Sequence, residues 1–312
     1  MIKALRKAGV LGINRRNIEF TLGENDRRLY PLVDDKLKTK ALCKRAGVAT
    51  AEIIGTASAH FEIAAFLKLL RGRGDFVLKP ARGAMGNGIL VIVDGNDEGW
   101  VTASGRKVNE ADIHYHASSI ISGLYALGGQ PDVAFAESRL EVHPSLRAVV
   151  RQGVPDIRII VFRGVPVMAM TRLPTNASDG KANLHQGAVG AGIDLITGRT
   201  TFAVLGSASI EKHPDTAQPV VGLSIPDFDE ALRIAVASTD LTGLGYIGAD
   251  IVIDASRGPL LLELNARPGL AIQSANREGL LRRLTAIRES SLDGLNVEQR
   301  IELSRRIARR QQ

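Results

Sequence analysis

The sequence is poor in cysteine and in aromatic residues. Its 312 residues include one cysteine, Cys43, which excludes an intrachain disulfide and any metal site built from several cysteines. A lone thiol fits a reducing compartment, so we expect a cytoplasmic protein. Aromatic residues make up 4% of the chain, which argues against a surface on which nucleic-acid bases stack. Nucleic acid is therefore not an expected partner.

Long apolar runs are absent as well. No run approaches the ~20 residues that cross a bilayer, so no membrane span is expected. The first residues carry charges without a following apolar stretch, so no secretory signal is expected either. Apolar residues nevertheless make up 45% of the chain, enough to form one large lobe or two to three smaller ones.

The formal net charge of +7 is concentrated at the two ends of the chain. Residues 1–28 hold seven Lys and Arg against three acids, and residues 282–312 hold eight Arg against four acids. Basic ends of this kind could attract nucleic acid, a membrane surface or an acidic protein. Solvated helices and a loose tail are the simpler interpretation.

Helical and extended patterns follow one another irregularly, which favours an α+β fold over a regular β–α–β series. Predicted helices cover residues 34–47, 58–70, 109–127, 228–244 and the basic segment 278–310. Predicted strands cover residues 49–55, 76–80, 88–93, 133–138, 157–162 and 165–172. Residues 2–8 could form a short helix, and the rest of the first 30 residues shows no clear alternation.

Two apolar strands, at residues 248–254 and 260–265, are predicted to form a hairpin that carries acids. Glu263 and Asn265 are two residues apart, so their side chains share one face of the strand. Asp250 would meet Glu263 across the hairpin. Carboxylate and amide oxygens suit Mg²⁺, so this face is a predicted metal site. The alternative is a pair of solvated acids on an exposed sheet.

A glycine-rich loop follows the strand that ends near Lys79. Gly83, Gly86 and Gly88 would let backbone N–H groups converge on an anion, and Lys79 would add a charge at a phosphate. The loop leads into a strand, so it is neither a Walker A motif nor a dinucleotide fingerprint. A plain turn is the alternative interpretation. Lys36, near a helix start, is a second candidate cation.

Arg158 stands in an otherwise apolar strand, where a charge needs a partner. That partner could be a structural acid such as Glu141, or Arg158 could face a cleft and hold an anionic substrate. Asn183 and His185 could lie near such a cleft. His185 could equally be an ordinary hydrogen-bonding residue.

Seven ordered motifs together resemble the ATP-grasp superfamily and, within it, the RimK-type α-L-glutamate ligases. They cover about residues 34–275 and are Asp35-Lys36, Val77–Pro80 with Gly83, Gly86 and Gly88, Glu137-Ser138, Asp156–Arg158, Lys181–Gly187, Gly248–Asp250 and Glu263–Gly269. Lys181 stands where the glutamate ligases have Arg. The segment Glu141–Leu146 resembles ATP-grasp proteins associated with polysaccharide sugar transfer.

The resemblance implies a fold of two α+β lobes that clasp ATP between antiparallel sheets, with the N-terminal pre-ATP-grasp domain missing or much reduced. It implies a basic N-terminal cap at residues 1–33, an ATP-grasp domain at 34–277, and basic C-terminal helices or a tail at 278–312. Within the domain, helices would occupy 34–75, a small ATP lobe with the glycine loop 76–137, and a large lobe with the metal site 138–277.

The resemblance also implies roles for individual residues. The residues implied for nucleotide binding are Lys36, Lys79, Arg82, Gly83, Gly86, Gly88, Glu137, Ser138, Asp156 and Asn183, with Glu137 and Ser138 at the adenine and Asp156 at the ribose. Asp250, Glu263 and Asn265 would hold a pair of Mg²⁺ ions, with Mn²⁺ as an alternative. The implied catalytic residues are Arg158, Lys181 and Asn265, and the candidates for substrate contact are Arg267 and His185.

The implied reaction joins a carboxylate to an amine at the expense of ATP, through an acyl-phosphate, with glutamate as one candidate substrate. The carboxylate and the amine could belong to small molecules or peptides. One alternative is an ATP-grasp kinase, or an acyl-phosphate-forming enzyme, without an amine acceptor. Another is a basic ATP-binding adaptor for RNA or an acidic partner. A homodimer is a further hypothesis, because a short N-terminal region would leave the cleft under-covered.

Overall fold

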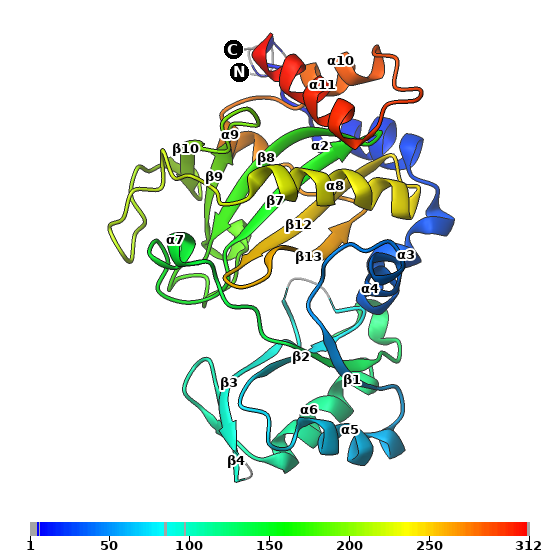
Figure 1. Cartoon of the computed structure of the whole chain (residues 1–312), viewed down its shortest axis with the longest axis vertical. Coiled ribbons are helices and arrows are strands. Elements are labelled where there is room, and N and C mark those ends of the chain that lie inside the picture. The colour runs from blue at the N-terminus through cyan, green and yellow to red at the C-terminus, as the bar shows by residue number, and fades with distance from the viewer. Residues whose placement is uncertain (1–4, 6, 84–85, 97, 311–312) are drawn as a thin grey trace. The chain divides into compact units, whose positions relative to one another are not determined.

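The computed structural model describes residues 5, 7–83, 86–96 and 98–310, which divide into two compact units. Unit 1 comprises Met1–Asp34, Lys38–Thr50 and Glu141–Gln312. Unit 2 comprises Asp35–Leu37 and Ala51–Leu140. Each unit contains one sheet with helices packed on it, which confirms the expected α+β class (Figure 1). Most of the predicted helix at 2–8 lies outside the described residues.

Unit 1 is built on a seven-stranded sheet in which every neighbouring pair of strands is antiparallel. In spatial order its strands are β11 (Ala208–Ser209), β10 (Thr200–Leu205), β9 (Val189–Ile193), β8 (Val165–Leu173), β7 (Asp156–Phe162), β12 (Tyr246–Asp254) and β13 (Gly258–Asn265). The hairpin predicted between β7 and β8 is confirmed. Arg163 and Gly164 form its turn with φ of 48° and 76°, the left-handed pair that suits a tight hairpin.

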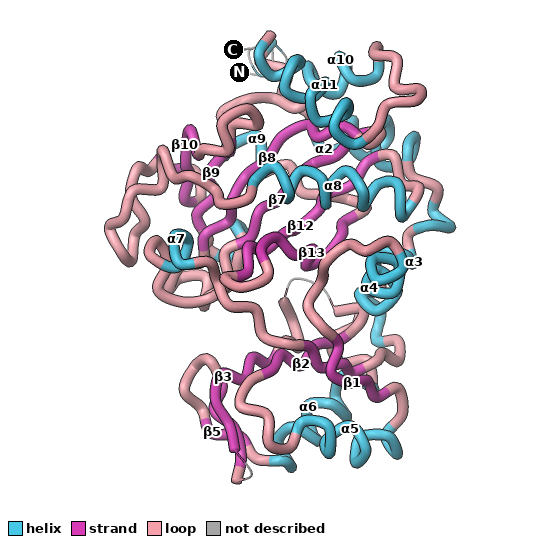
Figure 2. Tube along the Cα trace, in the orientation of Figure 1, coloured by secondary structure: helices cyan, strands magenta, loops and turns pink. Residues whose placement is uncertain are grey.

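Several helices accompany this sheet (Figure 2). They are α2 (Ile13–Arg15), the π-helix η1 (Arg16–Leu22), η2 (Arg27–Leu29), α3 (Pro31–Asp34), α4 (Lys36–Arg45), α7 (Pro144–Arg147), η5 (Leu184–Gln186), α8 (Phe228–Thr242), α9 (Ile272–Asn276), α10 (Leu281–Arg288) and α11 (Val297–Arg309). The first residues of α4, up to Leu37, group with unit 2. The helix predicted over 34–47 corresponds to α4, and the short helix α3 precedes it.

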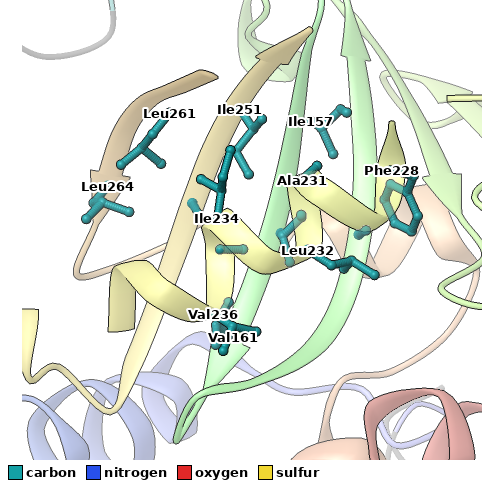
Figure 3. Packing of buried hydrophobic residues seen from close by; sticks show 14 of the residues in the cluster. Ile157, Val161, Phe228, Ala231, Leu232, Ile234, Val236, Ile251, Leu261 and Leu264 are labelled. Atoms are coloured by element: carbon teal, nitrogen blue, oxygen red, sulfur yellow. The ribbon is translucent and has the colours of Figure 1, made fainter. Parts of the chain in front are cut away.

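Helix α8 covers one face of the sheet in unit 1. Its buried residues, among them Phe228 and Leu232, pack on Ile157 and Val161 of β7 and Ile251 of β12 (Figure 3). Each such side chain stabilises the fold by about 1.5–3 kcal/mol through burial. The helix ends at Thr242, two residues before the predicted end, because Gly243 follows it in the left-handed conformation, with φ of 68°.

The other face of the sheet is covered by α9, α10, α11 and the N-terminal segment. Leu11 and Phe20 belong to the same buried cluster as Phe162 and Tyr246, whose side chains alternate with those beneath α8. Helical structure over residues 13–22 was not expected from the sequence. These helical residues help to cover the face of the sheet on which Asp250, Glu263 and Asn265 also lie.

Unit 2 is a six-stranded antiparallel sheet with helices packed against it. Its strands, in spatial order, are β1 (Ile53–Ala57), β6 (Ala134–Glu137), β2 (Phe76–Pro80), β3 (Leu90–Asn96), β4 (Gly99–Thr102) and β5 (Lys107–Val108). Its helices are η3 (His60–Glu62), α5 (Ile63–Leu70), α6 (Glu110–Ile121) and η4 (Leu127–Gly129). Helices α5 and α6 pack their apolar residues on this sheet.

Helix α6 is shorter than the predicted helix over 109–127. Asn109 caps its start, as its side chain accepts from the N–H of Asp112 at 3.0 Å. The helix ends at Ile121 because Gly123 takes a φ of 82°, and a Cβ there would lie 2.4 Å from the carbonyl oxygen of Gln130. Over the described residues, no helix is both long and apolar enough to cross a bilayer.

Candidate functional site

In unit 2, the predicted phosphate-binding cation Lys79 lies on β2 and forms an ion pair with Glu137 on the neighbouring strand β6. Both side chains are almost fully buried, with exposures of 11% and 2%. The carboxylate of Glu137 thus fixes the lysine ammonium on the sheet and compensates its charge where water cannot. The two sequence motifs that contain these residues are brought together by strand pairing.

Lys36 lies beside the glycine loop of the same unit. Its ammonium nitrogen donates to the carbonyl oxygen of Gly83 at 2.6 Å, and its backbone N–H donates to Ala81 at 2.9 Å. Arg82 is held next to it, with its Nε 3.5 Å from Asp35 and its backbone N–H 3.0 Å from Asp132. Three cationic side chains, Lys36, Lys79 and Arg82, therefore belong to the start of α4, β2 and the loop that follows β2.

The glycines of this loop are required by its geometry. Gly86 and Gly88 have φ of 75° and 74°, values that residues other than glycine rarely adopt. A Cβ on Gly83 would lie 2.2 Å from the ring of Pro80, and one on Gly88 would lie 2.5 Å from the ring of Tyr125. Ala84 and Met85, in the middle of the loop, lie outside the described residues.

Ser138 follows Glu137 at the end of β6 and ties β6 to the beginning of β1. Its N–H donates to the carbonyl of Glu52 at 2.9 Å, and its hydroxyl oxygen accepts from the N–H of Glu52 at 3.1 Å. The position predicted for the adenine is therefore held by hydrogen bonds between two strand ends.

In unit 1, the acidic hairpin forms as expected and contains a β-bulge at the acids. Asp250 lies opposite Glu263, whereas Ile251 lies opposite Leu261, so Leu262 is an extra residue in β13. The bulge lets Leu261 and Leu264 both reach the core beneath α8. Glu263 and Asn265 face the other side, where Asp250 also lies. The predicted meeting of these three side chains is confirmed, since the amide nitrogen of Asn265 is 3.4 Å from both carboxylates.

Two arginines complete this face of the sheet. Arg158 on β7 donates to both oxygens of Asp250, through Nε at 2.7 Å and through Nη2 at 2.5 Å. The partner of Arg158 is thus Asp250 and not Glu141. Arg172 on β8 donates through Nε to Asp156 at 2.6 Å and through Nη2 to Asp250 at 2.8 Å. The result is a buried chain of alternating charges across β8, β7 and β12.

The two buried aspartates of this chain differ in their electrostatics. Burial raises the pKa of Asp156, and Arg172, its principal cationic neighbour, only partly opposes that effect. Burial acts in the same direction on Asp250, but two guanidinium groups outweigh it and lower the pKa below its ordinary value. Asp250 is therefore a fixed negative charge in the middle of the face.

The donor set on this face fits Mg²⁺. Glu263 and Asn265 are half-buried, and no basic side chain forms an ion pair with Glu263 in the described part of the chain. The amide of Asn265 can turn about its last bond and offer its oxygen, which would give three hard oxygen donors with the carboxylates. Over the described ranges, this face included, no three His, Cys, Asp or Glu side chains gather as a metal site, so the proposed donor set consists of two carboxylates and one amide.

Three further predicted residues lie in the link between β8 and β9. Asn183 caps η5, where its side chain accepts from the N–H of His185 at 3.0 Å. His185 lines a cavity of about 350 Å³ with Leu184, Val204, Gly206, Ala271 and Ser274. For Lys181, the described structure gives a backbone bond to Ser178 and no side-chain partner. The structure therefore leaves the catalytic role of Lys181 as a prediction.

Arg267 follows Asn265 on the loop that leaves β13. Its guanidinium lies over the ring of Tyr30, 5.2 Å from the centroid, and 3.7 Å from the carboxylate of Asp34. The side chain is 57% exposed, so it remains accessible to an anionic ligand in solution. The predicted contact with an acid substrate stays a prediction.

Sequence reasoning missed Arg172. Like Arg158, it is a charge within an apolar strand, so the same argument applied to β8 would have identified it. It also missed Arg16 and Asn25, which are buried although they belong to a basic segment without alternation. For those two residues the sequence carries no signal.

The chain is similar in sequence to known proteins. Residues 15–289 match the model of the family described as sugar-transfer associated ATP-grasp. A probable alpha-L-glutamate ligase of Parasynechococcus marenigrum (strain WH8102) is 26% identical over 248 residues, which are 79% of this chain and 39% of that protein. One of Aliivibrio salmonicida (strain LFI1238) is 26% identical over 236 residues, 76% of this chain and 56% of the relative.

Among solved structures, D-alanine–D-alanine ligase from Bacillus anthracis is 13% identical, with a TM-score of 0.47 over 93% of this chain and 72% of that chain. The chain spans about half the length of the two glutamate-ligase relatives, or less. The family model, by contrast, covers most of this chain. The chain therefore belongs to the sugar-transfer associated ATP-grasp family.

Proposed function

We propose that this protein is an ADP-forming carboxylate–amine ligase that makes an amide or peptide bond through an acyl-phosphate. Family membership supports the use of ATP. The similarity to probable alpha-L-glutamate ligases makes glutamate the first amino acid to test. The observation that carries the proposal is the group of Arg158, Asp250, Glu263 and Asn265 on one face of the sheet of unit 1.

The residues of unit 2 bind the nucleotide in this proposal. Lys79 and Lys36 supply positive charge for the phosphates, and the loop from Arg82 to Gly88 offers backbone N–H groups to their oxygens. Glu137 and Ser138 provide hydrogen-bonding groups for the adenine. The ion pair between Lys79 and Glu137 and the hydrogen bond from Lys36 to Gly83 hold these side chains in place before any ligand binds, which lowers the entropic cost of binding.

The residues of unit 1 stabilise the charge that develops during the reaction. A substrate carboxylate oxygen attacks the γ-phosphorus of ATP, the bond to ADP breaks, and an acyl-phosphate results. An amine nitrogen then attacks the acyl carbon, the bond to phosphate breaks, and the amine loses a proton. Neither step needs a covalent enzyme nucleophile, so Cys43 has no catalytic role. Catalysis then depends on positioning and on charge neutralisation.

Arg158 and Arg172 keep Asp250 oriented towards Glu263 and Asn265. Arg158 also places a guanidinium on the same face, where it can neutralise a transferred phosphoryl group. Asp250, Glu263 and Asn265 would hold Mg²⁺, which when bound neutralises phosphate charge and favours phosphoryl transfer. The proposal places two such ions at these residues.

The test is a screen of the purified chain with Mg²⁺, ATP and pairs of amino acids, including glutamate, with products read by mass and ADP release measured. A ligase requires both an acid and an amine for sustained ADP release, and its product is lighter by one water than the sum of the two. ADP release that is independent of any amine would instead indicate a kinase or an acyl-phosphate-forming enzyme.

The variant Glu263→Gln removes a carboxylate from the metal site, whereas Glu302→Gln removes an exposed carboxylate on α11. We expect the first variant to lose turnover and the second to retain it. Turnover that survives in Glu263→Gln would refute the metal assignment.

Nucleotide binding without turnover in the wild-type chain would favour the adaptor hypothesis. Light scattering in solution tests the proposed homodimer, and a fluorescent fusion tests the proposed cytoplasmic location.

A further inference from the structure

The N-terminal segment of unit 1 touches the loop that follows the proposed metal ligand Asn265. Four buried hydrogen bonds between three pairs of residues join the N-terminal segment to this loop and to the helix α9 that follows it. Asn25 binds Ala266, Arg16 binds Pro268, and Gln273 binds both the N–H and the carbonyl of Leu11, at 2.8 Å and 3.1 Å. Buried hydrogen bonds of this kind are costly to break, because the remaining partner stays unpaired.

The side-chain amide of Asn25 makes backbone hydrogen bonds that a further pair of strand residues would otherwise make. The pairing of β12 with β13 ends at Gly248 and Asn265, so Ala266 has no partner on β12. The side-chain amide of Asn25 donates to the carbonyls of Tyr246 at 2.7 Å and Ala266 at 3.0 Å, and accepts from the N–H of Tyr246 at 2.8 Å. The residue is only 3% exposed. Its amide therefore continues the hydrogen bonding of the hairpin by one step.

Arg16 is a buried cation that donates a hydrogen bond to a loop carbonyl. Its Nη1 donates to Pro268 at 3.0 Å, its side chain is 8% exposed, and its Nε has no hydrogen-bond partner. Within the described residues, no carboxylate lies at ion-pair distance from it. Burying a guanidinium without an acid is expensive, so its hydrogen bond to the loop is its principal compensation.

The loop itself lies directly beside the acidic face. A Cβ on Gly248 would lie 2.8 Å from Cβ of Pro268, so Pro268 packs on β12 between Tyr246 and Asp250. Asn265 lies one residue before Ala266 and three before Pro268, whose carbonyls accept from Asn25 and Arg16. A shift of those carbonyls would move the Asn265 amide, which lies 3.4 Å from Asp250 and from Glu263.

We infer that Asn25 and Arg16 are positioning residues, which hold the Ala266–Pro268 loop so that Asn265 faces the metal site. The inference rests on the proposed function for the role of Asn265. It assigns to the N-terminal segment a part in the reaction that is separate from substrate contact.

The isosteric change Asn25→Asp tests the inference, because it removes both N–H donors and keeps the acceptor for Tyr246. We expect the affinity for Mn²⁺ in the presence of ADP, measured by electron paramagnetic resonance, to fall about 10- to 100-fold. Amide hydrogen exchange over residues 264–272, measured without ligand, should rise while exchange in β8 stays unchanged. Asn14→Asp, at an exposed position in α2, is the matched control and should change neither.

Arg16 provides a second pair of variants. Arg16→Met removes the donor to Pro268 and should raise exchange over 264–272, and Arg16→Lys should recover part of the Mn²⁺ affinity because it keeps a cationic donor. Arg28→Met, at an exposed residue paired with Asp26, controls for the loss of charge.

An Mn²⁺ affinity that is unchanged in folded Asn25→Asp would overturn the inference, as would exchange that rises equally in β8 and in the loop. If Asn25→Asp does not fold, the Arg16 variants decide by the same two measurements. A wild-type chain that binds no Mn²⁺ with ADP would overturn the metal assignment itself. In that case the exchange measurement still tests the contact with the loop, which separates the two failures.

Discussion

Replacing Arg172 by Met should destabilise unit 1 by about 3–5 kcal/mol, because it removes one partner from a buried ion network. Arg172 is 12% exposed, and its two acceptors, Asp156 and Asp250, are 4% and 0% exposed. Asp250 keeps Arg158 in the variant. The cost therefore falls mainly on Asp156, which is left as a buried carboxylate without its guanidinium.

Asp156 can escape part of this cost by taking up a proton. Burial already raises its pKa to about 6, above its ordinary value of 3.8, and loss of Arg172 would raise the pKa further. A carboxyl group whose pKa is higher in the folded state favours folding at low pH, and this contribution is lost as the pH rises through the folded pKa. The destabilisation of Arg172→Met should therefore be larger at pH 8 than at pH 5.

Urea unfolding measures both effects. A loss of 3 kcal/mol corresponds to a midpoint lower by at least about 1 M for the slopes usual in small proteins. Circular dichroism reports the whole chain, and Trp100, the single tryptophan, lies on β4 and reports unit 2. The additional change Asp156→Asn should restore part of the stability, because the unpaired charge disappears.

The matched control is Arg233→Met on α8. Arg233 also contacts two acids, Glu230 at 3.1 Å and Glu298 at 2.6 Å, but is 42% exposed, so its loss should cost no more than about 1 kcal/mol. The reasoning is refuted if Arg172→Met lies within 1 kcal/mol of the wild-type chain, or if Asp156→Asn fails to improve it.

Three further predictions concern single groups. Glu263→Gln should weaken Mg²⁺-dependent ADP binding at least about tenfold in calorimetry. The urea midpoint should stay nearly unchanged, since Glu263 is half-buried. Unchanged binding would contradict the role of Glu263 as a metal ligand. Cys43 is fully buried, and burial raises its pKa to about 11, so iodoacetamide should modify it in urea but not in the folded chain at pH 7.5, as mass spectrometry would show. Burial lowers the pKa of His116, whose ring lies 2.9 Å from the carbonyl of Gly88, so the neutral ring stabilises the folded chain. This contribution should be lost as the pH falls from 6.5, the ordinary value, through the lower pKa of the folded state. Urea unfolding followed by Trp100 fluorescence should show this pH dependence in the wild-type chain and not in His116→Gln.

The acidic hairpin could be predicted because its signals are local. Apolar alternation, a turn at residues 255–258 and the spacing of Glu263 and Asn265 define both strands and their shared face. The extra residue Leu262 could not be predicted, because a bulge depends on which side chains the core accepts. Leu261 and Leu264 both reach the core beneath α8, and that preference is visible only in three dimensions.

The N-terminal segment could not be predicted for a different reason. Its buried residues include Arg16 and Asn25, which in a basic sequence are typical of a solvated surface. Their partners, Pro268 and Ala266, lie 252 and 241 residues away in the chain. A pattern within a short window cannot reveal such contacts. The same limit applies to Arg158, whose partner Asp250 lies 92 residues away and is brought near by the pairing of β7 with β12.

The order of the two units along the chain has a consequence for biosynthesis. Unit 2 needs only Asp35–Leu37 and Ala51–Leu140, so all of its residues exist once Leu140 has left the ribosome. Unit 1 combines Met1–Asp34 and Lys38–Thr50 with Glu141–Gln312, so the native hydrogen bonds of Asn25 cannot form until Tyr246 and Ala266 have been translated. Because domains fold as units during synthesis, we expect unit 2 to fold first.

Pulse proteolysis of ribosome-stalled chains can follow this order. Chains stalled soon after Leu140 should protect residues 51–140 and leave residues 7–34 open to cleavage, and simultaneous protection of both would contradict the expectation. The earliest residues to be made would then be among the last to reach their native contacts, and they would need to stay soluble while exposing Leu11 and Phe20.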